Sequence, residues 1–488
     1  MSGVELFLLI LAVVVGFYAA WNIGANDVAN AMGTSVGSRA LTLRRAVVLA
    51  AVFEFAGAYL VGSNVSETIR KKVFDPQMFE VVFGAQASVV LACGMIAALL
   101  AAGSWLLFAT YFGWPVSTTH SIVGAVVGVG ATALGAGQVA WSKVGIITAG
   151  WIVSPVLSGA AAYLLFRILL SKVYYQRDPL TAAKRFAPYI VFLVVLVLVG
   201  VGAFKGLKPS WHRWGIDPFS RQVVLGTLGV ALVLGTAAFF VARRLLARIT
   251  EGTSVCNPIG YAEAARSLGK VIVHLRRVRE TCNGGLSEQA GLLIRQAKQL
   301  REQTLAEVEQ FSSEARWHAV ERVFVPVQVM TACFVAFAHG SNDVANAVGP
   351  LSAAVQALTS HSVRMTAGVP AWVLALGGVG IVIGLATWGW RVMKTVGEKI
   401  TELTPSRGFC AEFAAAIVIL VASVMPLGLP ISTTHTLVGA VLGVGLARGL
   451  TALNLSVART ILASWVVTIP AGAILASLFY LLLRVLVG

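Results

Sequence analysis

Residues 24–31 read GANDVANA and residues 340–347 read GSNDVANA, so one octapeptide occurs twice, 316 residues apart. A second motif repeats at nearly the same separation, because residues 115–120 read PVSTTH and residues 430–435 read PISTTH. The agreement between the two separations indicates an internally duplicated chain. Both motifs place polar side chains beside strongly apolar segments, where such groups are costly and usually mark a transport pathway.

The composition is that of a membrane protein. Of the 488 residues, 57% are hydrophobic and 12% are charged, and the mean hydropathy is +0.83. A soluble chain would carry about 25% charged residues. Apolar segments recur, as at residues 4–20 and 223–242; the first lacks the marks of a cleaved signal, so we expect it to be retained. The sequence predicts an all-α polytopic membrane protein with about 10 to 12 transmembrane segments.

Charge, cysteine content and missing motifs exclude several other classes. The net charge of +16 could suit nucleic acid, but Lys and Arg gather in the cytoplasmic loops of membrane proteins, so we expect no nucleic-acid partner. The five cysteines are scattered without a CxxC pair, which argues against a disulfide framework or a zinc site. No GxxxxGK[ST] loop or HExxH pair occurs, so nothing supports an ATP-driven pump or a metalloenzyme.

The chain divides into four parts. Residues 1–170 and 323–488 are the two repeats, residues 171–250 hold connecting transmembrane helices, and residues 251–322 form the one long hydrophilic segment. This segment is predicted to be a helical hairpin that turns at Asn283-Gly284-Gly285. A regulatory role and a solvated linker are both open for it.

Basic residues indicate the topology. Arg243, Arg244 and Arg248 open the hydrophilic segment, which places it in the cytoplasm. Counting the spans back from this segment places the end of the first repeat and the start of the second repeat both on the cytoplasmic side. The same count predicts that both chain termini lie outside. The repeats then have inverted topology. Inverted repeats with broken helices or re-entrant hairpins are typical of secondary transporters, whose substrate sites lie at the repeat interface.

The Asn-Asp motif has the chemistry of a cation site. Asn26 and Asn30 are four residues apart, so on a helix their side chains can converge near Asp27. Amide and carboxylate oxygens suit Na⁺ or another hard cation. Gly24 and Gly33 flank the motif and would permit an unwound backbone. A helix cap is the alternative, although its occurrence at two matched positions weakens that interpretation.

The hydroxyl strings suit an anion instead. Ser117, Thr118 and Thr119 follow Pro115 and precede an apolar helix, and their counterparts repeat the pattern. At a helix start, hydroxyls and free backbone N–H groups point together toward an anion. Two such half-helices facing each other would hold a tetrahedral anion, with ordinary capping as the alternative. The following histidines, His120 and His435, could carry protons or orient the helices.

Two acidic residues lie inside apolar spans, Glu54 and Glu412. An acid at this depth is by default a functional hypothesis, here a cation ligand or part of a proton relay. A hydrogen-bonded structural role is the alternative for each.

The duplicated GANDVANA/GSNDVANA and PVSTTH/PISTTH motifs resemble those of the inorganic phosphate transporter (PiT) family over both repeats. The resemblance implies cation-coupled symport of inorganic phosphate across a plasma or inner membrane. Na⁺ is the expected coupling ion, and no other cofactor is expected. The second copy has Ser341 for Ala25 and Pro350 for Thr34, so the half-sites need not be equivalent. By resemblance, the phosphate-binding residues are Asp27, Ser117, Thr118, Thr119, Asp343, Ser432, Thr433 and Thr434, and the sodium-binding residues are Asn26, Asn30, Asn342 and Asn346.

Other functions remain as alternatives. Coupling to H⁺, or transport of a metal–phosphate complex, would use the same motifs. A membrane-embedded hydrolase is disfavoured because no GxSxG elbow surrounds either serine, so we expect the protein not to be an enzyme. A channel is disfavoured because two inverted, closed half-sites do not make a lined pore. The oligomeric state is open, with a homodimer as one possibility.

Overall fold

The computed structural model describes residues 2–61, 73–201, 215, 217, 220–249, 258–363, 368–424 and 431–487. Within these ranges every regular element is a helix. The first repeat contains α1 (Gly3–Asn26), α2 (Val28–Gly37), α3 (Leu43–Val61), α5 (Met78–Phe83), η1 (Gly84–Gln86), α6 (Ala87–Tyr111), α7 (Thr118–Leu134), η2 (Ala136–Gln138) and α8 (Trp141–Leu169). It is followed by η3 (Leu170–Tyr174), α9 (Pro179–Val201), α11 (Arg221–Ala247) and α12 (Pro258–Thr281).

The second repeat begins inside a long helix. It is built from α13 (Gly285–Ser360), α14 (Ala371–Trp388), α15 (Trp390–Lys394), η5 (Thr395–Lys399), α16 (Pro405–Val424), α17 (Thr433–Arg448), η6 (Leu450–Ala452) and α18 (Leu455–Val487). Helix α13 therefore continues from the hydrophilic segment into the second repeat without a break. The turn expected before it is present, because α12 ends at Thr281 and Gly284 has a φ of 74°.

The chain forms two compact units. One unit comprises Met1–Leu170, Ile190–Ala238 and Val325–Gly488, and the other comprises Ser171–Tyr189 and Phe239–Phe324. The first unit holds nearly all of both repeats, and we call it the transport unit. The second holds α12 with the first half of α13.

Within the transport unit the repeats pack against each other in a reciprocal manner. Helix α7 packs on α18 while its counterpart α17 packs on α8, and α6 and α16 flank the same pairs. Glycines allow these close approaches: a side chain on Gly128 would collide with the backbone of Ala473, and one on Gly443 with that of Gly159. The core therefore lies along the seam between the repeats.

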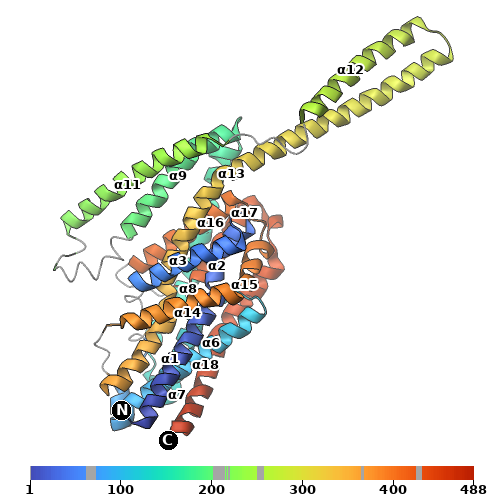
Figure 1. The fold of residues 1–488 in the computed structure, drawn as a ribbon. Helices are drawn as coiled ribbons and strands as arrows, with labels where there is room; N and C mark the ends of the chain where they lie inside the picture. The colour runs from blue at the N-terminus through green and yellow to red at the C-terminus, as the bar shows by residue number, and fades with distance from the viewer. Residues whose placement is uncertain are drawn as a thin grey trace. The chain divides into compact units, whose positions relative to one another are not determined.

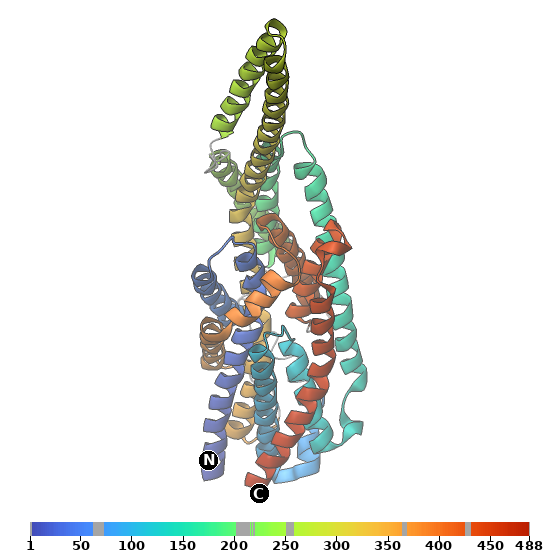
Figure 2. The ribbon, with the colours of Figure 1, turned by 90° about the vertical axis from the view of Figure 1, so that its right-hand side faces the viewer.

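The two repeats run in opposite directions. Helix α1 and the part of α13 in the transport unit are antiparallel, as are α8 and α18 (Figure 1). A contact between helix ends supports this antiparallel arrangement. Glu5 Oε1, at the start of α1, lies 3.2 Å from Nδ1 of His361, which directly follows the end of α13. Both chain ends lie at the same end of this unit (Figure 2). The predicted inverted all-helical architecture is confirmed.

Eight helices among the described residues are long and apolar enough to cross a membrane. The sequence predicted about 10 to 12 segments, and helices α3, α7, α16 and α17 lie outside this set of eight. Helices α7 and α17 have 17 and 16 residues, too short to span alone, and each begins after extended backbone. These are the broken helices of the two repeats.

The glycines of the Asn-Asp motif have a different role from the one expected. Helix α1 is interrupted only at Asp27, and α13 runs through the second motif without interruption. Gly24 is helical and lies against the backbone of Ile381, where any side chain would collide. The motif's first glycine therefore serves close helix packing between α1 and α14, not unwinding.

Candidate functional site

Two buried aspartates hold the hydroxyl strings of both repeats. Asp27, between α1 and α2, accepts hydrogen bonds from Thr118 (Oγ1–Oδ2, 2.6 Å) and from Thr434. Asp343, within α13, accepts one from Thr433 at 2.6 Å. Both aspartates are at most 1% exposed. Segments separated by hundreds of residues thus meet at one point, with Asp27 bridging the two repeats.

Each hydroxyl string lies at the start of a half-helix, as expected. Ser117 and Ser432 have extended backbones and cap α7 and α17: their Oγ atoms accept from the backbone N–H groups of His120 and His435, both at 3.2 Å. A capping hydroxyl can still donate its own hydrogen. Thr119 is 2% exposed and its Oγ1 lies 3.4 Å from Asn346 Nδ2. Pro430 lies outside the described residues.

The motif asparagines divide between two tasks. Asn342 donates to Asp343 at 3.0 Å, and Asn346 donates to Thr118 at 2.9 Å. Asn26 instead holds the segment before α7: its amide nitrogen donates to Thr110 Oγ1 (2.9 Å) and to the Trp114 carbonyl (3.0 Å), and its Oδ1 accepts from the N–H of Val116. The side chain of Asn30 lies outside the described residues. The second motif therefore faces the aspartates, and Asn26 positions a loop.

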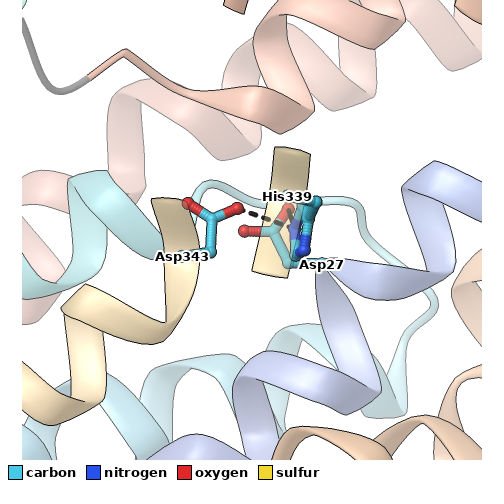
Figure 3. Close-up of side chains that lie close together, drawn as sticks. All are labelled: Asp27, His339 and Asp343. Atoms are coloured by element: carbon cyan, nitrogen blue, oxygen red, sulfur yellow. Dashed lines mark ion pairs between the residues drawn. The ribbon is translucent and has the colours of Figure 1, made fainter. Parts of the chain in front are cut away.

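A histidine that the motif analysis did not include completes the cluster. His339 lies one helical turn before Asp343 on α13, and Figure 3 shows its ring beside Asp27, with its ion pair to Asp343 drawn as a dashed line. Its Nε2 is 2.7 Å from Asp343 Oδ2 and 3.8 Å from Asp27 Oδ1, while its Nδ1 is 3.0 Å from Glu54 Oε2. One signal was present in the sequence: a histidine directly precedes the second motif at apolar depth, where the first repeat has Ile23.

The two buried glutamates have different surroundings. Glu54 on α3 reaches the site through His339. Glu412 on α16 is a separate hydrogen-bonded group, whose carboxylate accepts from donors on α2 and α13: Thr34 (2.5 Å), Ser35 (2.7 Å), Thr331 (2.6 Å) and Gln328 (3.3 Å). Because Pro350 replaces Thr34 in the second repeat, the half-sites are not equivalent.

The histidines of the STTH strings pack in an aromatic layer. The His435 ring stacks on Trp465 with centroids 3.5 Å apart, and the His120 ring lies 3.7 Å from that of Trp151. The two imidazoles are 4.2 Å apart, and His435 Nδ1 lies 3.3 Å from the Trp151 carbonyl oxygen. These contacts hold both rings at the starts of α7 and α17, and the Nδ1 contact of His435 fits the helix-orienting role; whether either histidine carries protons stays a prediction.

The cluster suits cations as well as an anion. Asp27, His339 and Asp343 each offer one ligand atom, and these atoms lie within 4.8 Å of one another. Carboxylate oxygens are preferred by hard cations, and the adjacent amides of Asn342 and Asn346 offer further oxygens. Hydroxyl donors and helix starts face the same place and suit an oxyanion. The arrangement can therefore hold oppositely charged ions side by side.

Comparisons with known proteins agree with this chemistry. The sequence profile of the Phosphate transporter family matches residues 23–476. A candidate phosphate permease of Chlamydia pneumoniae is 43% identical over 98% of this chain and 99% of its own length. The chloroplastic inorganic phosphate transporter 2-1 of Arabidopsis thaliana is 42% identical over 95% of this chain and 70% of its own.

A solved structure resembles the whole chain. It is described as the sodium-dependent phosphate transporter, with 34% sequence identity, a TM-score of 0.75, and coverage of 98% of this chain and 99% of the other. The duplicated motifs, the inverted helical repeats and these matches lead to one conclusion: the chain belongs to the phosphate transporter family.

Proposed function

We propose that this protein is a secondary active transporter that carries inorganic phosphate across a membrane together with Na⁺. One observation carries the proposal: Asp27 accepts hydrogen bonds from Thr118 of one repeat and Thr434 of the other. A ligand held at this point contacts both inverted repeats. Movement of one repeat against the other would then expose it to alternate sides of the membrane.

The hydroxyl strings and aspartates supply the phosphate site. Thr118, Thr433 and Thr434 now donate to carboxylates, and they can turn toward phosphate oxygens when the anion binds. The free N–H groups at the starts of α7 and α17 add donors. Protonated phosphate oxygens can donate back to Asp27 and Asp343. Ser117, Thr119 and Ser432 complete the proposed set.

Electrostatics explains why cations must accompany the anion. Asp27, Asp343 and Glu54 bring up to three negative charges, against at most one positive charge on His339. A further anion about 4 Å from a carboxylate is repelled by about 4 kcal/mol at an effective dielectric constant of about 20. A hydrogen bond to a charged group contributes about 1.5–3 kcal/mol, so two or more such bonds are needed to offset the repulsion from a single carboxylate. With up to three carboxylates at the site, bound cations are the more effective means of balancing the charge.

Sodium is the proposed cation because the available ligands are hard oxygen atoms. These come from the two aspartates and from Asn342 and Asn346, with Asn30 as a further expected ligand. The structural relative described as sodium-dependent supports the same choice. Asn26 was in the expected ligand set, but its amide is occupied by the segment before α7, which makes it a positioning residue.

Imposed gradients in proteoliposomes test the coupling ion. We expect an inward Na⁺ gradient to drive concentrative uptake of radiolabelled phosphate at constant pH, and a pH gradient without Na⁺ to drive little. Counterflow should occur when unlabelled phosphate is placed inside, because a carrier exchanges its ligand and a channel does not. Uptake that follows the pH gradient alone would contradict sodium coupling.

Proton-coupled symport is the second candidate, and one observation favours it. The Nδ1 atom of His339 is hydrogen-bonded with Glu54, and its Nε2 atom lies 2.7 Å from Asp343 Oδ2, so a doubly protonated imidazole would place its positive charge against both carboxylates. A proton held on His339 would supply one of the positive charges needed to balance the bound phosphate. The gradient experiment separates the two candidates. Sodium coupling predicts uptake driven by the Na⁺ gradient at constant pH, and proton coupling predicts uptake driven by the pH gradient without Na⁺.

The hydrophilic segment, residues 251–322, is proposed to be cytoplasmic and dispensable for the transport cycle, with both termini on the opposite side. The threonines and the histidine that contact the two aspartates in the described part of the chain belong to the transport unit. We expect a variant with a short flexible linker in place of residues 258–315 to retain at least about half of wild-type uptake. Complete loss of uptake by a variant that still folds would assign the segment an essential role.

A further inference from the structure

Helix α12 and the first part of α13 form an antiparallel hairpin (Figure 2). The register follows from two contacts: Ser287 donates to the carbonyl of Arg279 across the turn, and Gly269 lies opposite Arg301. The buried seam between the helices is thin. Its apolar core consists of Ile272, Ile294 and Ala297 with Leu275 packed against them.

One face of this hairpin carries an exposed apolar stripe. On α13 the stripe contains Leu286, Leu293 and Leu300, which recur every seven residues and are 60%, 49% and 52% exposed. On α12 it contains Val271 and Val278, also seven residues apart and 45% and 37% exposed. With about 100° per residue, both sets are turned to the same side of the seam. In the observed register the five side chains alternate between the helices along one face.

The flanks of the stripe are uncharged. Gln289, Gln296 and Gln303 recur every seven residues beside the leucines, and Ser267 and His274 lie beside the valines, all exposed. The charged residues of the same stretch point elsewhere. On α13, Arg295 and Lys298 are turned by about 100° to the other side of the seam. The hairpin thus has a charged side and a side built from leucine, valine and glutamine.

We propose that this face, which we call the Leu/Gln face, binds the same face of a second copy of this chain, so that two hairpins form a four-helix bundle. Leucine repeating with a polar amide at seven-residue spacing is the pattern of a coiled-coil seam. Glutamine both donates and accepts, so each amide can pair with that of an identical partner. An isologous two-fold contact needs such self-complementarity.

Other occupants are less well matched to this chemistry. An anionic lipid surface attracts clusters of Lys and Arg, and the Leu/Gln face has none. A charged partner protein would likewise find no complementary charge. All copies in one membrane present their hairpins on the same side, and this confinement raises their effective concentration, so that even a modest interface pairs them.

Two leucines of α13 provide a matched pair of variants. Leu293 is 49% exposed on the Leu/Gln face, and Leu305 is 45% exposed and follows Lys298 by seven residues, so it lies on the other side of the seam. In full-length protein reconstituted in liposomes, single-molecule photobleaching counts the copies in each particle. We expect wild type and Leu305→Glu to be dimeric, and Leu293→Glu to associate at least tenfold more weakly while retaining phosphate uptake, which shows that it is folded.

Cysteine cross-linking tests the contact itself. In a background with Cys256 and Cys282 replaced by serine, Gln296→Cys should form an intermolecular disulfide on mild oxidation. Lys298→Cys, on the other side of the same helix, should not. A monomeric wild type at all protein densities would overturn the proposal, and so would a dimer that is unchanged by Leu293→Glu and does not cross-link at residue 296.

Discussion

Replacing Asp27 or Asp343 by asparagine is expected to lower phosphate uptake by roughly 10² to 10⁴-fold, because hydrogen bonds to a charged group contribute about 1.5–3 kcal/mol each. Asp27 holds the threonines of both repeats, and Asp343 holds Thr433 and contacts His339. Asparagine keeps the shape and removes the charge. It therefore weakens the proposed cation site and the hydroxyl contacts while leaving the packing nearly unchanged.

The measurement is initial uptake in proteoliposomes that contain equal amounts of reconstituted protein. Glu402→Gln is a matched control, since Glu402 is 75% exposed and pairs only with the surface residues Arg407 and Arg448 in the described structure. We expect the control to transport at near wild-type rates. Near wild-type uptake by either aspartate variant would mean that the site lies elsewhere.

Selectivity between anions should be equally pronounced. Near neutral pH, phosphate carries at least one O–H donor and sulfate carries none. A site that surrounds the anion with hydroxyl donors and also offers Asp27 and Asp343 as acceptors suits an anion that donates as well as accepts. Sites built around such a hydrogen bond reject an analogue without the donor by roughly 10⁴-fold, since the buried partner is left unpaired. Arsenate has the shape and protonation of phosphate and should be accepted.

Competition against radiolabelled phosphate measures this selectivity. Arsenate is expected to inhibit uptake at concentrations similar to those of unlabelled phosphate. Sulfate should have little effect even in large excess. Strong inhibition by sulfate, or none by arsenate, would contradict the acceptor role given to the two aspartates. The result is independent of the coupling ion, because all arms use the same cation gradient.

Several features of the site were predictable because they depend on local sequence. The pattern of serine and threonine after proline predicted that α7 and α17 begin at these hydroxyls, and Ser117 and Ser432 do cap them. The two aspartates were singled out because a charged group in an apolar segment is costly unless it serves a purpose. The duplicated motifs predicted two repeats, and the positions of the basic residues predicted that the repeats are inverted.

Other features depend on which segments meet in space. Nothing in the order of residues says that Asp27 lies against Thr434, 407 positions away. His339 belongs to no duplicated motif, and only the packing of the helices places its ring beside Asp27 as well as Asp343, with Glu54 of α3 at its other nitrogen. Asn26 and Asn342 occupy matched motif positions, yet one holds a loop and the other an aspartate.

The sequence alone determined the membrane class, the inverted duplication and the polar residues at depth. These follow from composition and spacing, which act within one helix or one turn. Only the tertiary structure decided how the polar residues are shared between the repeats, that Glu412 is satisfied apart from the aspartates, and that the Leu/Gln face of the hairpin stays exposed. The physical reason is that a buried charge must be hydrogen-bonded or paired, and its partners come from whichever helices pack against it. A local sequence motif does not specify which helices those are.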